Sequence, residues 1–250
     1  MSTIQNKTIL VTGANRGIGR ALVEEALRRG AKRVYAAARN TAALKELVEA
    51  SDGKVVAVPL DVTNEAQIQA AAKIAADTQI LVNNAGIAIY TGIISAADST
   101  SARAQMEVNY FGLMNMTRAF APILAKNGGG IVVNISSIGG LVGIPAMGTY
   151  GASKAAIHSL TQSVRGELSA QGTHVIGVYP GPIDTDMTAG LPFDKETPQQ
   201  VAREILKGIE SGAEEVYPDK MALDFVAKLK TDAKELEKEW STVLPQPVEA

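Results

Sequence analysis

The feature that most constrains the fold is a short apolar run that leads through clustered glycines into a helical pattern. Residues 8–12 read Thr-Ile-Leu-Val-Thr, which is apolar and β-branched enough for a buried strand. Gly13, Gly17 and Gly19 follow, and residues 20–29 then have helical period. Glycines let a backbone turn sharply and approach a phosphate, and the free N–H groups of a helix N-terminus attract an anion. The pattern predicts a strand, tight turn and helix that bind a nucleotide; a plain structural turn is the alternative.

The same alternation of strand and helix patterns continues along most of the chain. The other predicted strands are 33–38, 54–60, 79–82, 130–135, 173–179 and a short one at 215–217. The clearest helical patterns are 100–124, 150–170, 198–208 and a charged tail at about 220–242. Alternation of this kind is typical of a parallel sheet covered on both faces. We therefore expect an α/β fold, a doubly wound parallel sheet, in a single domain spanning 1–250.

Composition excludes several classes of function. The net charge is −2 and no polybasic run occurs, so nucleic acid is not an expected partner. The absence of cysteine excludes disulfides and thiolate sites, and two isolated histidines predict no metal site. The N-terminus lacks an apolar signal core and no apolar run reaches membrane-spanning length. We expect a cytoplasmic protein with no membrane partner.

The end of the second strand indicates which nucleotide fits. About twenty residues beyond the glycines, where an acidic residue commonly binds a ribose 2′-hydroxyl, the sequence has Ala38-Arg39. No carboxylate repels a 2′-phosphate there, and the guanidinium groups of Arg16 and Arg39 are suited to bind one. The pair favours NADP over NAD, unless both side chains are ordinary solvated surface residues.

Polar residues also follow the next two strands. Asp61 ends the third strand, where it either accepts a hydrogen bond from an adenine amino group or caps the helix that begins near Asn64, or does both. The segment 83–86, Asn-Asn-Ala-Gly, is typical of a structural turn at a strand end. Asn109 lies among apolar neighbours in a helical stretch and therefore needs a hydrogen-bond partner, either backbone or water.

Candidate chemistry centres on Ser137, Tyr150 and Lys154. Tyr150 and Lys154 are four residues apart, so a helix presents them on one face, where the ammonium lowers the phenol pKa. A phenol with a lowered pKa is a useful proton donor near neutral pH. Ser137 follows the fifth strand, at the end of the sheet where such folds bind ligands, and supplies a hydroxyl to hold a substrate oxygen. The alternative is an ordinary tyrosine–lysine pair on a solvated helix face.

The sequence after the sixth strand predicts a covered, apolar ligand pocket. The run 180–182, Pro-Gly-Pro, forces the chain out of the sheet, and the segment of about 185–197 is either a lid or an ordinary packed loop. The apolar residues expected to line the pocket are Leu141, Val142, Ile144, Met147, Met187, Leu191 and Phe193. They favour an apolar or aromatic ligand. Trp240 in the tail is predicted to be a packing anchor.

Together these motifs resemble the short-chain dehydrogenase/reductase family over about residues 5–217. The motifs are, in order, Thr12-Gly13-Ala-Asn-Arg-Gly17-Ile-Gly19, Asp61-Val62, Asn83-Asn84-Ala85-Gly86, Asn109, Ser137, Tyr150-x-x-x-Lys154 and Pro180-Gly181 leading to Thr185. Each motif alone is unspecific, whereas their conjunction is highly specific. The resemblance implies a Rossmann fold and an NADP(H) cofactor, because basic residues at the positions of Arg16 and Arg39 mark NADP-preferring members.

The resemblance also assigns roles residue by residue. The implied cofactor contacts are Gly13, Asn15, Arg16, Gly17, Ile18, Gly19, Arg39, Asp61, Val62, Asn84, Ala85, Gly86, Tyr150, Lys154, Pro180, Gly181, Ile183 and Thr185. The implied catalytic residues are Ser137, Tyr150, Lys154 and Asn109, the last holding a water that leads to Lys154.

The implied activity is NADPH-dependent reduction of a ketone or aldehyde, reversible as an alcohol dehydrogenase. An NAD-linked alcohol oxidation is one alternative, and a non-catalytic NADP-binding sensor is another. The resemblance further implies a homodimer through the helices near 100–125 and 150–170. A tetramer is possible, but many tetrameric members end in a strand followed by Asp-Gly-Gly, and this chain has Glu-Val-Tyr-Pro-Asp-Lys at 215–220.

Overall fold

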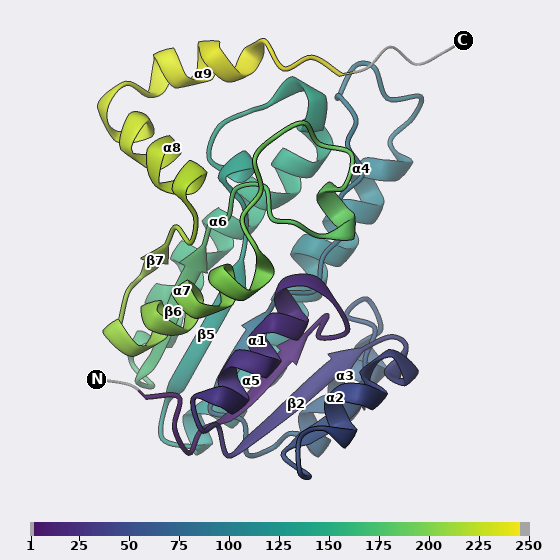
Figure 1. Cartoon of the computed structure of the whole chain (residues 1–250), viewed down its shortest axis with the longest axis vertical. Helices are drawn as coiled ribbons and strands as arrows, with labels where there is room; N and C mark the ends of the chain where they lie inside the picture. Colours follow the sequence, from purple (N-terminus) through teal and green to yellow (C-terminus); the bar gives the residue numbers. More distant parts are fainter. Residues whose placement is uncertain (1–2, 246–250) are drawn as a thin grey trace.

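The computed structural model describes residues 3–245 and contains one seven-stranded parallel sheet with helices on both faces (Figure 1). The strand order is β3-β2-β1-β4-β5-β6-β7, and each neighbouring pair is parallel. The predicted doubly wound, Rossmann-type sheet in a single domain is confirmed.

The elements follow the predicted alternation. The strands are β1 (Thr8–Thr12), β2 (Arg33–Ala38), β3 (Val55–Pro59), β4 (Ile80–Asn83), β5 (Gly130–Ile135), β6 (Thr173–Val178) and β7 (Glu215–Val216). The helices are α1 (Gly17–Arg28), α2 (Lys45–Glu49), α3 (Glu65–Ile74), α4 (Thr100–Gln105), α5 (Leu113–Lys126), α6 (Gly148–Ser169), α7 (Pro198–Ser211), α8 (Lys220–Thr231) and α9 (Ala233–Ser241). Shorter helical turns are η1 (Thr41–Leu44), the π-helical η2 (Met106–Gly112), η3 (Ile138–Gly140), η4 (Pro145–Met147) and η5 (Asp186–Thr188).

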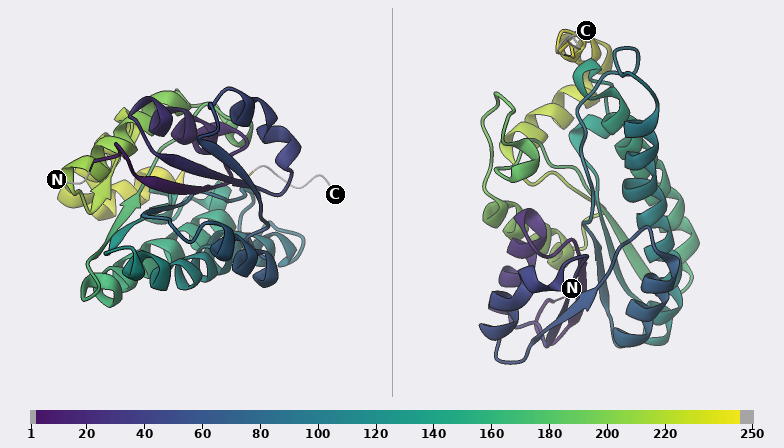
Figure 2. Two further views of the ribbon diagram at one scale, coloured as in Figure 1. Left: turned by 90° about the horizontal axis from the view of Figure 1, so that it is seen from below. Right: turned by 90° about the vertical axis from the view of Figure 1, so that its right-hand side faces the viewer.

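Two cores lie on opposite faces of the sheet, because successive strand side chains point to opposite sides. In β1, Ile9 and Val11 belong to the core beneath α1 and α7, whereas Leu10 belongs to the core beneath α3 and α5. Met116 and Phe120 on α5 are fully buried in the second core. The right-hand view of Figure 2 shows the sheet between these two helical layers. Burial on both faces explains why the strands read as continuous apolar runs.

Several boundaries differ from the prediction. Helix α1 begins at Gly17 rather than at residue 20, because the extended residue Arg16 already serves as its N-cap. The predicted single helical tail is wrong: it breaks at Asp232, whose side chain accepts a hydrogen bond from the Glu235 N–H (2.9 Å) and starts α9. The predicted helix at 100–124 is interrupted by the π-helical η2, which contains Asn109.

The sheet reverses its order between β1 and β4, and the candidate site lies at that point. β2 and β3 extend to one side of β1, and β5 to β7 extend to the other side of β4. Ligands of such sheets bind beyond the carboxyl ends of the strands, where the order reverses. Helices α8 and α9 stand beyond this carboxyl edge (Figure 1).

Candidate active site

A cleft of about 750 Å³ opens at the carboxyl edge of the sheet. All of the residues predicted to contact the cofactor line it except Gly19, and Ser137 lines it too. Gly19 and Asn109 do not line the cleft but lie beneath it, buried. The sequence motifs are therefore brought together in one place, from strands and loops that are far apart in the chain.

The glycine turn after β1 needs its glycines for two different reasons. Gly13 and Gly17 have φ of 66° and 54°, a conformation that disfavours residues with a Cβ. Gly19 has ordinary φ, but a Cβ there would overlap the Gly13 carbonyl oxygen. The turn leads into α1, whose first-turn N–H groups have no partner within the helix, and Gly17 and Ile18 line the cleft. This is a cradle for an anionic group such as a phosphate.

The turn after β4 is locked to the glycine turn. The Asn84 side chain donates hydrogen bonds to the carbonyl oxygens of Thr12 (2.9 Å) and Gly13 (3.2 Å). The Thr12 hydroxyl in turn accepts from the N–H groups of Asn84 (2.9 Å) and Ala85 (3.0 Å). The structural role predicted for this Asn-Asn-Ala-Gly turn is therefore confirmed, and the turn holds the ends of β1 and β4 in register.

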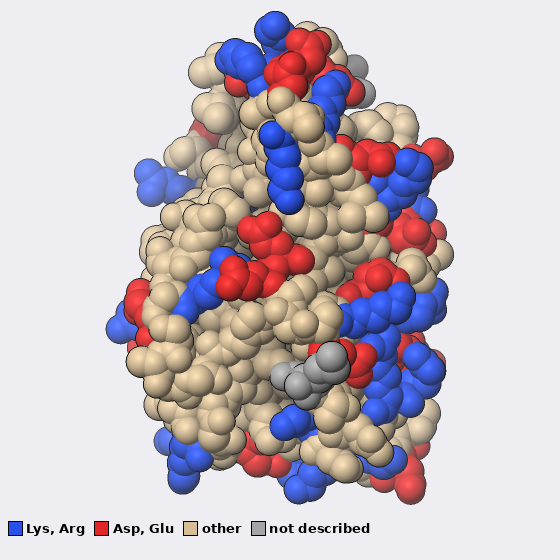
Figure 3. Space-filling model, turned by 90° about the vertical axis from the view of Figure 1, so that its left-hand side faces the viewer, with Lys and Arg blue, Asp and Glu red and all other residues tan. Residues whose placement is uncertain are grey.

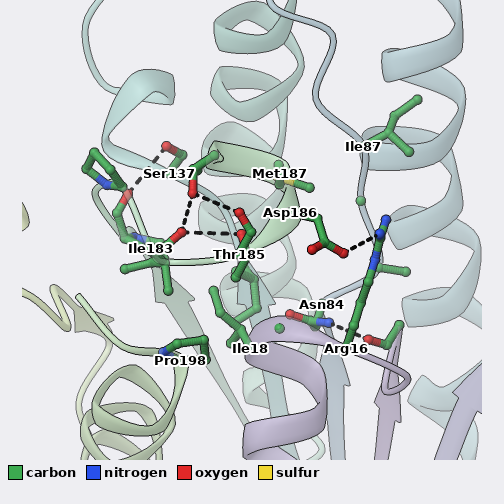
Figure 4. A pocket seen from close by; sticks show the side chains of 18 of the residues that line it. Arg16, Ile18, Asn84, Ile87, Ser137, Ile183, Thr185, Asp186, Met187 and Pro198 are labelled. Carbon is green, nitrogen blue, oxygen red and sulfur yellow. Dashed lines mark hydrogen bonds and ion pairs between the residues drawn. The ribbon is translucent and has the colours of Figure 1, made fainter. Parts of the chain in front are cut away.

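The two arginines predicted to bind a 2′-phosphate differ in their surroundings. Arg16 forms an exposed ion pair with Asp186 (2.8 Å), which joins the glycine turn to η5 across the cleft (Figure 4). Arg39 forms no ion pair with any residue between 3 and 245 and lies near Asp61. Both arginines line the cleft, each with a carboxylate nearby.

Asp61 is not the cap of α3. Its carboxylate accepts hydrogen bonds from the N–H (3.0 Å) and hydroxyl (2.7 Å) of Thr63, and the backbone hydrogen bond is the main reason its pKa is lowered. Asn64 is the cap, because its side chain accepts from the Gln67 N–H (3.1 Å). The capping alternative is therefore wrong, and Asp61 lines the cleft beside Val62.

Ser137 and Tyr150 meet on the other side of the cleft. Ser137 lies in the loop directly after β5, and its hydroxyl donates to the Pro180 carbonyl oxygen (3.4 Å; Figure 4). The same hydroxyl accepts from the Gly139 N–H (3.2 Å). Tyr150 is buried on the first turns of α6. Burial raises the Tyr150 pKa above its usual value, and the nearby Ser137 hydroxyl partly opposes this.

Lys154 is buried behind Tyr150. Its ammonium donates to the Ile135 carbonyl oxygen (2.9 Å) and lies 5.6 Å from the centroid of the Tyr150 ring. Burial lowers the Lys154 pKa to about 8. We predicted that Lys154 lowers the Tyr150 pKa; in this structure that prediction is wrong, because Ser137 is the group that lowers it. The physical reason is that the ammonium is directed at the end of β5 instead of at the phenol.

Asn109 supports the site from beneath. Its side chain accepts from the Ile87 N–H (2.8 Å) and donates to the Ile87 carbonyl (2.9 Å) and the Ser153 hydroxyl (2.9 Å). Ser153 donates to the Tyr150 carbonyl oxygen (2.7 Å), so Asn109 links the loop after β4 to the first turns of α6. Both amide hydrogens are used in this way, which matches the structural alternative; π-helical turns of this kind are frequent at functional sites.

The loop after β6 is held by a residue that sequence reasoning missed. Asp219 is buried and accepts hydrogen bonds from the Gly181 N–H (2.8 Å) and, as the N-cap of α8, from the Ala222 N–H (2.8 Å). The following loop is closed by a bridge between Ile183 and Glu196. Thr185 packs over the glycine turn, since a Cβ on Gly17 would lie 3.1 Å from its methyl group.

The apolar end of the cleft differs in part from the prediction. The predicted residues that line it are Ile144, Met147, Met187, Leu191 and Phe193. The prediction for Leu141 and Val142 is wrong, because both pack into a separate cluster with Tyr179 and Phe225 beneath α8. Sequence reasoning missed the lining residues Tyr90, Ile138, Met221 and Trp240.

Residues 3–245 lack the features of two other kinds of site. No helix there is long and apolar enough to cross a membrane. Nor does that range contain a group of three or more histidine, aspartate or glutamate residues placed to hold a metal ion. On the face shown in Figure 3, lysine and arginine side chains are interspersed with aspartate and glutamate.

The doubly wound sheet, the glycine turn and the Ser137–Tyr150–Lys154 group define the class of oxidoreductases that bind a dinucleotide. The family model described as short chain dehydrogenase matches residues 7–196. The chain therefore belongs to the short-chain dehydrogenase family.

Individual relatives agree with this membership. A short chain dehydrogenase from Burkholderia cenocepacia J2315, solved in complex with NADP, is 40% identical with a TM-score of 0.91, covering 96% of this chain and 99% of that one. A 7α-hydroxysteroid dehydrogenase complexed with NADH and 7-oxo glycochenodeoxycholic acid is 25% identical with a TM-score of 0.79, covering 85% and 92%. The ketoacyl reductase HetN of Nostoc sp. is 32% identical over 230 residues, 86% of this chain and 79% of that protein.

Proposed function

We propose that this chain is an NADPH-dependent reductase of ketones or aldehydes, acting reversibly as an alcohol dehydrogenase. The observation that carries the proposal is that Ser137, Tyr150 and Lys154 all line the cleft, with the Lys154 ammonium 5.6 Å from the centroid of the Tyr150 ring. A neutral donor pair beside a dinucleotide cradle is suited to protonating an oxygen on which negative charge develops.

The fit of the cofactor is supported by the shape and charge of the cleft. Gly13 and Gly17 give the turn the positive φ that close approach to a pyrophosphate requires, and the N-terminus of α1 attracts its charge. Arg39 and Arg16 suit a 2′-phosphate, and no carboxylate follows Ala38 to repel one. The 40% identical relative solved in complex with NADP supports the same preference. The bound nicotinamide supplies the hydride chemistry.

Each protein residue then has a defined task in the proposed reaction. Tyr150 donates its proton to the developing alkoxide, or removes it in oxidation. Its raised pKa keeps the phenol protonated at neutral pH and also makes it a weaker acid. Ser137 donates a hydrogen bond to the carbonyl oxygen of the substrate as charge grows there. With the cofactor bound, Lys154 would hold a ribose hydroxyl and return a proton toward Tyr150. Asn109 holds a water on that path through the remaining lone pair of its side-chain oxygen.

The apolar end of the cleft supports an apolar or aromatic substrate. Ile144, Met147, Leu191 and Phe193 contribute four apolar side chains to the cleft that the candidate donors line. The loop 185–197 is proposed to act as a lid, because it lies over the glycine turn and is tied down at its start by the exposed Arg16–Asp186 ion pair. An exposed pair of this kind contributes little stability and opens easily.

The decisive experiment follows NADPH absorbance with a panel of ketones for the wild type and Tyr150→Phe. General acid catalysis contributes about 10²–10⁴-fold, so we expect turnover to fall by about 10³-fold while NADPH affinity, measured by calorimetry, changes little. Tyr110→Phe is the matched control, since it removes the same hydroxyl from a ring outside the cleft. Wild-type turnover in Tyr150→Phe would contradict the proposed role of Tyr150 as proton donor.

The same assay separates the alternatives. A non-catalytic sensor binds NADPH but consumes none with any ketone. An NAD-linked alcohol oxidation gives a higher kcat/KM with NADH than with NADPH.

Assembly as a homodimer through α4, α5 and α6 belongs to the same proposal. Phe111 on η2 leaves 41% of its surface exposed beside these helices, which suits a partner contact. Light scattering tests the proposal, since a purely monomeric mass contradicts it.

A further inference from the structure

We propose that Trp240 on α9 is a specificity-determining residue that forms the far wall of the substrate cleft and selects carbonyl substrates bearing a flat aromatic or polycyclic group. This inference rests on the proposed carbonyl reduction and names the substrate class for it. Trp240 was predicted to be a packing anchor, but its position in the structure gives it a second role.

Helix α9 is almost wholly exposed apart from two side chains. Leu236 is buried against α8 in a cluster with Phe225, and Trp240 is partly buried one turn further on. Trp240 lines the main cleft and also a neighbouring cavity of about 460 Å³. Met221 lines both as well, so the two side chains help to separate the cleft from the cavity. Leu236 thus attaches the helix, and Trp240 is the side chain that α9 contributes to the cleft.

Two other aromatic rings hold the indole in place. The Phe225 ring centroid on α8 lies 5.6 Å away at an interplanar angle of 58°, and that of Phe193 on the loop after η5 lies 6.1 Å away at 44°. Tilted contacts of this kind are favourable, and neither ring lies parallel to the indole to cover its face. The indole N–H donates to no other residue between 3 and 245, so packing alone orients the ring.

The chain on both sides of Trp240 is fixed to the body of the protein. Before it, Leu236 is buried against α8, and Glu239 adds an exposed ion pair with Lys228 on the same helix. After it, the Val243 carbonyl accepts from the Ala146 N–H (2.9 Å), and Pro245 packs beside Gly92. These contacts hold the chain on both sides of Trp240, so the indole ring has a fixed position in the wall of the cleft.

The two ends of the cleft therefore differ in chemistry. Ser137 and Tyr150 provide hydroxyl groups, and the Tyr90 ring packs edge-on to Tyr150 at 5.8 Å. Beyond them the wall is apolar and carries the rings of Phe193 and Trp240. A ketone with a flat apolar body can place its carbonyl at the hydroxyls and its rings against this wall. The match to the family model ends at residue 196, so α8 and α9 shape the pocket outside the region that the family model describes.

The test compares kcat/KM for 2-acetylnaphthalene and for butanone in Trp240→Ala, with NADPH as cofactor. We expect the ratio to fall about tenfold, which corresponds to exposing about 50 Å² of apolar substrate surface. Trp240→Phe keeps an aromatic ring, so its ratio is expected to stay within about threefold of the wild-type ratio. Leu223→Ala, on the exposed side of α8 and outside the cleft, is the matched control and should leave it unchanged.

An unchanged ratio in Trp240→Ala, with an active wild type, overturns this inference and leaves the proposed function standing. If the wild type does not consume NADPH with any of the carbonyl compounds tested, both this inference and the proposed function are overturned. If Trp240→Ala does not fold, as judged by circular dichroism, Trp240→Leu keeps apolar packing on Phe225 and carries the same test.

A second readout needs no turnover. Trp240 is the sole tryptophan of the chain, so its emission reports on this wall directly. We expect 2-acetylnaphthalene to quench it in the protein loaded with NADP⁺, and butanone to leave it unchanged. Equal effects of the two ketones overturn the inference.

Discussion

Replacing Lys154 with methionine is expected to make the folded chain more stable at neutral pH. Lys154 is buried and forms no ion pair with any residue that the structure describes, and burial lowers its pKa from 10.5 to about 8. A buried ammonium without a carboxylate destabilises the folded state, because it has lost its hydration. Methionine has a similar length and carries no charge.

The size of the effect follows from the two pKa values. At about 1.4 kcal/mol for each tenfold change in proton affinity, the difference between 10.5 and about 8 corresponds to about 3 kcal/mol of destabilisation at neutral pH. Methionine leaves the Ile135 carbonyl oxygen without its donor, which costs about 1 kcal/mol. The variant should therefore be about 2 kcal/mol more stable than the wild type.

The difference in stability between Lys154→Met and the wild type should change sign as the pH rises. Between about pH 8 and 10.5 the folded wild type releases the lysine proton while the unfolded chain still holds it, so wild-type stability rises with pH in this window. Near pH 10.5 the destabilisation by charge is largely gone, and the lost hydrogen bond leaves the variant about 1 kcal/mol less stable. Ionisation of Tyr150 is common to both proteins and cancels in the comparison.

Urea unfolding followed by circular dichroism at pH 7, 9 and 10.5 measures this difference. Lys73→Met on the exposed side of α3 is the matched control, expected within about 0.5 kcal/mol of the wild type throughout. A Lys154→Met variant that is less stable at pH 7, or a difference that does not change with pH, refutes the reasoning.

Three further substitutions test other parts of the site. Arg39→Ala should raise the KM for NADPH about tenfold and the KM for NADH little, since it removes a phosphate contact; steady-state kinetics with equal effects on both cofactors would contradict this. Gly19→Ala should abolish NADPH binding in calorimetry, because its Cβ overlaps the Gly13 carbonyl; wild-type affinity would show that the turn adapts. Asp219→Ala should lower the free energy of unfolding in urea by about 1–3 kcal/mol, because it leaves the Gly181 N–H without its acceptor. An unchanged midpoint of urea unfolding would show that Asp219 does not hold the loop after β6.

The polar half of the site was predictable because parallel strands bring their carboxyl ends to one edge. Gly13, Asn84 and Ser137 each follow a buried strand, so their proximity follows from the fold alone. The apolar strands were predictable for a similar reason, since burial on both faces leaves continuous apolar runs.

The apolar half was predictable only in part, because loops and the tail build it: Ile144, Met147, Met187, Leu191 and Phe193 line the cleft as predicted. The spacing of Asp232 and Glu235 is that of a helix N-cap and could have indicated the break, but nothing in the charged pattern of 220–242 indicates that the break turns Trp240 toward the cleft. Leu141 and Val142 lie in the expected segment but point into another cluster, since a loop has no periodicity from which a face can be read. Helical spacing placed Tyr150 and Lys154 on one face, but it did not determine that the ammonium is directed at Ile135.

The position of β1 beside β4 also has a consequence for how the chain folds. Val11 pairs with Val82, so this central contact closes a loop of about 70 residues, with an entropic cost of about 4 kcal/mol. β2 and β3 lie on one side of the junction, and β5 to β7 lie on the other. The two turns of the nucleotide cradle follow β1 and β4, so the cradle is complete only after this slow non-local pairing. The cofactor can therefore bind and stabilise the folded chain, but it cannot bind to the early stages of folding.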